Sequence, residues 1–264
     1  MTMTMTTLLN RLSLTALLTC AASAVQAHDI VLEPQRDSVA VRYGHAQDWQ
    51  QVQDGKLVDL QLLRGSDAPQ DMRASLRPRR IDFLMPLPTG SAPLLVAARY
   101  DNGLWARLPA AAGAKAVARN TTRVMLPQAA LVTNNLKFAK ALLLTPEDTV
   151  VYKRTVGHLL ELVPQRNPAS LKAGEMLDVL VLFKGQPQPD VEIELSNLED
   201  LPTADKVQRF RSDAKGIARV AFFPKGVSTL GALFERPNDG SLGEASRAVG
   251  ADKFVLAASL TFVR

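Results

Sequence analysis

Cysteine is almost absent from this chain, because the single cysteine, Cys20, lies within the first 27 residues. If that segment is removed, disulfide bonds and thiolate chemistry are excluded from the mature protein, and packing must supply its stability. The excess of positive charge is also small, since the chain has 31 basic and 26 acidic residues. A net charge of +5 over 264 residues does not favour nucleic-acid binding.

The short motifs of common catalytic sites are missing as well. The sequence contains no Gly-x-Ser-x-Gly turn, no His-Glu-x-x-His pair and no phosphate-binding glycine loop. We therefore expect a protein that is not an enzyme. Glu161, on an expected strand, fits a solvated face better than a paired acid and base. Long hydrophobic runs are scarce too, because the apolar stretch from Leu12 to Ala22 is too short to span a membrane.

Residues 1–27 have the features of a cleavable signal peptide. The apolar stretch follows one charged residue, and the small residues Val25 and Ala27 stand three and one positions before the bond that precedes His28. Cleavage at this bond predicts export to the periplasm and a soluble mature chain that begins at His28. The alternative is a lipoprotein cut before Cys20, although threonine is a poor residue to precede a lipidated cysteine.

Apolar and polar residues alternate through much of the chain, and this period of two predicts strands with one buried face. After residue 157 we expect seven strands, which is the size of an immunoglobulin-like sandwich. They are 158–163, 176–184, 190–196, 207–212, 216–223, 228–235 and 254–262. The part before them is less regular, with strands near 38–43, 57–63, 81–85, 94–100 and 122–126. Segment 136–143 is ambiguous between helix and strand.

The predicted fold class is all-β, with two β-sandwich (immunoglobulin-like) domains after the cleaved signal peptide. The polar stretch 145–153 suggests the boundary between them. Residues 28–154 would form an N-terminal β-rich domain, and residues 155–264 a C-terminal immunoglobulin-like β-sandwich domain.

Several short motifs occur in an order that resembles one protein family. They are His28 with Leu32-Glu33-Pro34, Tyr43-Gly44, Gly157-His158, Lys184-Gly185-Gln186-Pro187, Ser212-Asp213-Ala214-Lys215-Gly216 and Leu260-Thr261-Phe262. The chain is similar to a family of periplasmic proteins of unknown function that is catalogued with the periplasmic components of cobalt and nickel uptake systems. The stretch Gln186-Pro187-Gln188 departs from the Lys-Pro-Leu that is more frequent in relatives, but it touches only a turn. The resemblance implies metal handling outside the cytoplasm and supplies no ligand set.

The chain has three histidines, His28, His45 and His158, and all three fall within these motifs. Imidazole is the commonest metal ligand and suits nickel, cobalt, copper and zinc alike. At a new N-terminus, the free amine and the ring of His28 can chelate one ion together. A second imidazole, from His45 or His158, would complete a three-nitrogen site, with Asp29 available as an oxygen ligand.

Each histidine also has an ordinary structural explanation. His28 can be a polar chain start, His45 can belong to a solvated turn, and His158 can be a hydrogen-bonding residue at a domain junction. Two functions therefore stay open. The first is a periplasmic accessory protein that binds a divalent transition metal ion, namely nickel, cobalt or copper. It would capture this ion or relay it to an inner-membrane metal transporter or reductase. The second is a β-sandwich interaction or scaffold module of an envelope complex that binds no metal.

Overall fold

The computed structural model describes residues 29–45, 48–88, 90, 93–109, 117–197, 207–223, 225–242 and 250–263. Strands dominate these ranges, and they pack face to face as sheets, which confirms the predicted all-β sandwich fold. The helical segments are single turns of 3₁₀ helix: Asp54–Lys56, Arg73–Ser75, Val151–Lys153 and Pro168–Ser170. None of the helices within the described ranges is long and apolar enough to cross a membrane.

The strands of the described residues form three sheets. The central sheet contains β4 (Leu57–Arg64), β5 (Gln70–Asp71), β8 (Leu94–Arg107), β9 (Val117–Arg119), β10 (Leu131–Leu143), β14 (Glu192–Asn197), β15 (Gln208–Arg211), β17 (Val227–Pro237) and β18 (Lys253–Val263). The N-terminal sheet contains β1 (Asp29–Pro34), β2 (Ser38–His45), β3 (Asp48–Gln50), β6 (Arg77–Pro78) and β7 (Phe83–Pro86). The C-terminal sheet contains β11 (Leu160–Pro164), β12 (Leu177–Phe183), β13 (Gln186–Pro187) and β16 (Ile217–Val220).

The central sheet joins strands from both halves of the chain. Its middle is the parallel pair β10 and β18, which runs from Thr133 opposite Lys253 to Leu142 opposite Phe262. β8 flanks this pair on one side and β17 on the other, both antiparallel to their neighbours. The expected domain boundary at residue 154 stays a prediction. The central sheet contains strands from before residue 154, such as β8 and β10, and strands from after it, such as β17 and β18.

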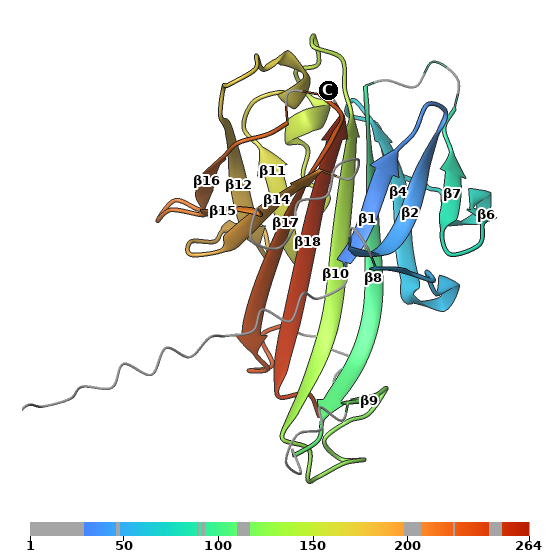
Figure 1. Ribbon diagram of the computed structural model, residues 1–264, viewed down its shortest axis with the longest axis vertical. Helices are drawn as coiled ribbons and strands as arrows, with labels where there is room; N and C mark the ends of the chain where they lie inside the picture. Colours follow the sequence, from blue (N-terminus) through green and yellow to red (C-terminus); the bar gives the residue numbers. More distant parts are fainter. Residues whose placement is uncertain are drawn as a thin grey trace, which may run out of the picture.

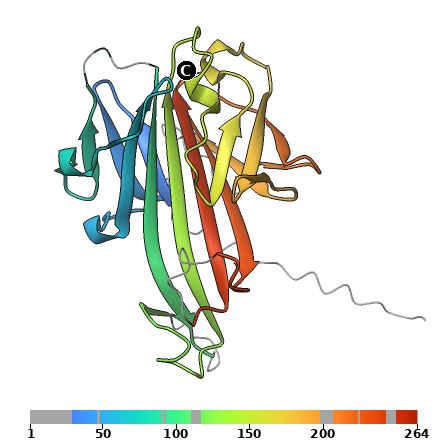
Figure 2. The same ribbon diagram turned by 180° about the vertical axis from the view of Figure 1, so that it is seen from behind.

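The two smaller sheets cover opposite faces of the central sheet. Successive side chains of a strand point to opposite faces, and on β10 Ala139 and Ala141 belong to the core under the N-terminal sheet. Phe138 and Leu142 belong instead to the core under the C-terminal sheet. The two views agree, because the blue strands β1 and β2 are on the near side of the central sheet in Figure 1 and the yellow strand β11 is on its near side in Figure 2.

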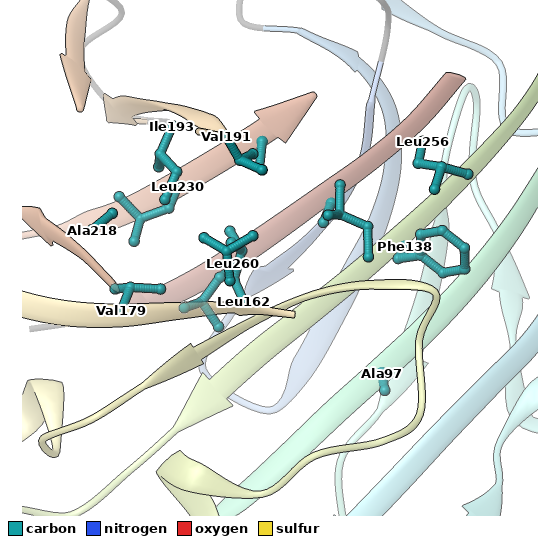
Figure 3. Packing of buried hydrophobic residues seen from close by; sticks show 14 of the residues in the cluster. Ala97, Phe138, Leu162, Val179, Val191, Ile193, Ala218, Leu230, Leu256 and Leu260 are labelled. Atoms are coloured by element: carbon teal, nitrogen blue, oxygen red, sulfur yellow. The ribbon is translucent and has the colours of Figure 1, made fainter. Parts of the chain in front are cut away.

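The larger core lies between the C-terminal sheet and the central sheet. Figure 3 shows Leu162 and Val179 of the C-terminal sheet beside Leu260 of β18. Leu230 of β17 and Phe138 of β10 extend the same cluster along the central sheet. The apolar alternation seen in the sequence thus becomes one continuous layer of packed side chains, which is where most of the stability of this fold arises.

Most strand predictions are confirmed, and the exceptions have physical reasons. Each of the seven strands expected after residue 157 is present, with ends shifted by a few residues. Segment 136–143 is part of β10, which is apolar on both sides because it lies between two cores. The strand expected at 122–126 is wrong. That segment is a turn in which the backbone N–H of Leu126 donates to the carbonyl of Thr122, and Val124 is 76% exposed.

Candidate metal site

Asp29 begins β1 and lies beside the end of β2. In the antiparallel pair of β1 and β2, Ile30 is opposite Tyr43 and Asp29 is opposite Gly44. The register is fixed by burial, because Ile30 is fully buried and Tyr43 nearly so on the face toward the central sheet. Asp29 therefore lies beside Gly44, the residue that directly precedes His45.

Gly44 permits a close crossing of the chain at this point. Its φ of +134° is unfavourable for any residue with a side chain, and a Cβ atom there would lie 2.3 Å from the carbonyl oxygen of Asp48. In the following hairpin His45 pairs with Asp48. Gly44 thus sets the backbone position of His45, whose side chain is outside the described part of the structure.

His28 lies outside the described residues. Of the other predicted ligands, Asp29 is opposite Gly44 of β2, and His45 is bonded to Gly44. Asp29 and the backbone of His45 consequently belong to one end of the N-terminal sheet.

Asp29 also forms an ion pair with a buried lysine of the central sheet. The Nζ atom of Lys137 lies 3.5 Å from Oδ1 of Asp29, and the lysine side chain is 3% exposed, whereas that of Asp29 is 32% exposed. Burial lowers the pKa of Lys137, and the charge of Asp29 opposes this effect. The contact ties the start of β1 to β10.

Two stacked tyrosines lie beside this ion pair. The rings of Tyr43 and Tyr100 have centroids 5.1 Å apart, and Tyr100 is opposite Lys137 in the central sheet. Burial, together with the neighbouring Tyr100, raises the pKa of Tyr43 to about 12. Tyr43 is therefore a neutral phenol at physiological pH and does not add a phenolate to the oxygen ligands at this end of the sheet.

His158 has a different environment. Its side chain is buried, and its ring centroid is 5.1 Å from that of Phe138. Burial lowers the pKa of His158 to about 3, and the positive charges of Lys140 and Arg99 act in the same direction. The ring is thus neutral at pH 7, and the same two cations oppose the approach of a metal ion.

The structure separates His158 from Asp29. His158 contacts Phe138, while Asp29 pairs with Lys137, and these neighbouring residues of β10 point to opposite faces of the central sheet. Among the described residues, no group of three or more His, Cys, Asp or Glu side chains could hold a metal ion. Among the predicted ligands, the structure places Asp29 beside the backbone of His45 and places His158 apart from both.

A second buried ion pair was not anticipated from the sequence. The Nζ atom of Lys140 donates to Oε1 of Glu161 at 2.9 Å, and both side chains are 2% exposed. The same nitrogen reaches the carbonyl oxygens of Arg154, at 2.9 Å, and Leu162, at 3.2 Å. The expectation that Glu161 lies on a solvated face is wrong, because its carboxylate joins β10 to the segment before β11. The signal in the sequence is the presence of two lysines within the apolar stretch of β10.

Comparisons with known proteins identify relatives without an assigned role. The model of a family described as a domain of unknown function (DUF4198) matches residues 25–236. A protein of Haemophilus influenzae, described as uncharacterized, is 30% identical over 225 residues, which cover 84% of this chain and 86% of the relative. Neither description mentions cobalt, nickel or a catalytic activity. The link to metal uptake that the sequence suggests thus stays a prediction.

Proposed function

The chain belongs to the DUF4198 family, and we propose that it is a periplasmic protein that binds a divalent transition metal ion and relays it to an inner-membrane transporter or reductase. The observation that carries this proposal is the pairing of Asp29 with Gly44. It brings Asp29, the residue after the predicted mature N-terminus, beside Gly44, which directly precedes His45. Two of the predicted ligands thus come from neighbouring strands of one sheet, which supports the proposal.

The donor chemistry fits a late first-row metal. The amine and imidazole of His28, the imidazole of His45 and the carboxylate of Asp29 would supply nitrogen donors with one oxygen donor. Such donors suit copper(II) and nickel(II), and affinity for a given site rises through cobalt and nickel to copper. The buried and electropositive surroundings of His158 favour a structural role for that residue instead.

Export is part of the proposal, because the amine of His28 exists only after cleavage behind Ala27. The apolar stretch and the small residues before His28 support such cleavage. The match to the family model begins at residue 25, which is close to that bond. In the periplasm the protein would meet metal ions before an inner-membrane partner does.

The test is calorimetric titration of the exported protein, with its first residue verified by mass spectrometry. Copper(II), nickel(II), cobalt(II) and zinc(II) are titrated in turn. We expect one ion bound per chain, weaker binding by His45→Ala, and unchanged binding by the matched variant His158→Phe. A protein that binds none of the four ions would refute the proposal and would favour the interaction or scaffold module.

A further inference from the structure

One turn of the central sheet exposes apolar side chains far more than the rest of the described chain. It comprises residues 120–130, which connect β9 to β10. Val124 is 76% exposed and Met125 is 68% exposed, whereas the other exposed large hydrophobic residues among those described lie between 36% and 43%. With the partly buried Leu126 and the exposed Pro127 they form a run of four apolar residues. Exposed apolar runs are generally avoided in water unless they serve a function.

Specific contacts hold this turn in its conformation. The backbone N–H of Met125 donates to Oγ1 of Thr122 at 3.1 Å, and the N–H of Leu126 donates to the carbonyl of Thr122 at 3.0 Å. The side chain of Arg123 pairs with Asp252, directly before β18, and Leu126 packs against the larger core. The fold therefore fixes the two most exposed side chains in solvent and leaves them no buried place to occupy.

The turn lies at one end of the longest axis of the molecule. Its neighbours β8 and β10 are 14 and 13 residues long, which makes them the longest strands of the described chain. In Figures 1 and 2 the turn belongs to the light-green segment beside β9 at the lower end of the central sheet, whereas β1, β2, β11 and β12 cover the upper part of that sheet. The turn can therefore meet a flat surface before the two smaller sheets do.

The charge around the turn is of one sign. The sequence contains no acidic residue from position 102 to position 146. The basic residues in the part of this stretch before β10 are Arg107, Lys115, Arg119 and Arg123. Arg119 ends β9, and the carbonyl of Arg107 accepts from the N–H of Ala130 at 2.8 Å, so an exposed arginine stands at each end of the turn. Neither of these two arginines has an ion-pair partner among the described residues.

We propose that the turn 120–130 is a docking surface for an acidic phospholipid membrane, into which Val124 and Met125 insert while Arg107 and Arg119 attract the phosphate groups. Apolar side chains are stabilised at the boundary between headgroups and acyl chains, and basic residues are attracted to a negatively charged membrane surface. A stable protein partner needs about 800 Å² of surface on each side, and the narrow end of a sheet suits shallow insertion between lipids better. This inference goes beyond the proposed metal binding and does not depend on it.

The experiment measures sedimentation of the exported protein with phosphatidylcholine vesicles that contain or lack phosphatidylglycerol. The double variant Val124→Ser with Met125→Ser is compared with Val150→Ser and Met176→Ser, which changes the same two residue types at positions 41% and 39% exposed outside the turn. We expect the wild type and this control to bind the acidic vesicles, and the turn variant to bind them at least about 10-fold more weakly. Raising the salt from about 0.1 M to about 1 M should release the wild type, because the Debye length falls from about 10 Å to about 3 Å.

A second measurement reports on insertion itself. The sequence has no cysteine after Cys20, so an environment-sensitive fluorophore can be attached to Met125→Cys or, as the control, to Met176→Cys. We expect acidic vesicles to shift the emission to shorter wavelength for the label at position 125 and to leave the label at position 176 unchanged.

Three results would overturn the proposal. The first is a wild type that does not sediment with acidic vesicles, which would favour a protein partner for the turn instead. The second is equal sedimentation with both kinds of vesicle, and the third is equal binding by the wild type and the turn variant. If the turn variant fails to fold, an unchanged emission from the label at position 125 in the presence of acidic vesicles would overturn the proposal in its place. None of these results bears on metal titration, so the two proposals fail separately.

Discussion

The buried imidazole of His158 makes the stability of this protein depend on pH. In the unfolded chain a histidine titrates near its reference pKa of about 6.5, whereas the folded environment lowers the pKa of His158 to about 3. Between these values the unfolded state binds more protons than the folded state. Stability from this group is therefore full above pH 6.5 and is lost as the pH falls toward 3.

The size of the effect follows from the two pKa values. Acidification from pH 7 to pH 4.5 should lower the free energy of unfolding by about 3 kcal/mol through His158 alone. In His158→Phe this part of the loss should disappear, because phenylalanine does not titrate and fits the contact with Phe138. Other groups contribute to the slope in both proteins, so the difference between the two slopes isolates the histidine.

The assay is urea denaturation of both proteins at several pH values between 4.5 and 7.5, followed by tryptophan fluorescence. Trp49 and Trp105 are the reporters. Parallel stability curves for the wild type and His158→Phe would contradict this prediction, because they would mean that the imidazole is protonated as easily in the folded protein as in the unfolded chain.

Two further predictions concern stability. Lys140→Met should lower the free energy of unfolding in urea by about 3–5 kcal/mol, because the carboxylate of Glu161 then stays buried without its cation. The double variant Lys140→Met with Glu161→Gln should recover part of this loss. A Lys140→Met variant as stable as the wild type would contradict a structural role of this ion pair. Gly44→Ala should lower the free energy of unfolding by about 1–3 kcal/mol or more, because φ is positive at this position and the new methyl group would clash with the carbonyl oxygen of Asp48. The same substitution should weaken copper binding. Its control, Gly55→Ala, has open space around the new methyl group, so equal losses in the two would argue against the close crossing.

The fold could be predicted from the sequence wherever a strand buries one face. Segments such as 254–262 alternate clearly, and they form strands close to the expected ends. The alternation of apolar and polar residues disappears in β10, because its two faces are covered by different sheets. The strand Asp29–Pro34 was missed for the same reason, since several consecutive residues are buried there. The turn at 122–126 was misread because two of its apolar side chains, Val124 and Met125, are exposed.

The candidate site could be predicted only in part. Local sequence identified Asp29 and His45, and the register of one hairpin brings them together. Local sequence could not show that His158 lies on the other face of the central sheet, because this depends on how β10 is covered by strands far away in the chain. The partners of Lys137 and Lys140 were hidden for the same reason, since each ion pair joins segments that meet only in the folded protein.

In the proposed function, cleavage before His28 creates a metal ligand, and a comparison of two N-termini measures whether it does. Copper(II) and nickel(II) are titrated into the mature protein and into a form with one additional alanine before His28. We expect the extension to weaken binding strongly, because it moves the free amine away from the imidazole of His28. Equal affinity of the two proteins for both ions would contradict it.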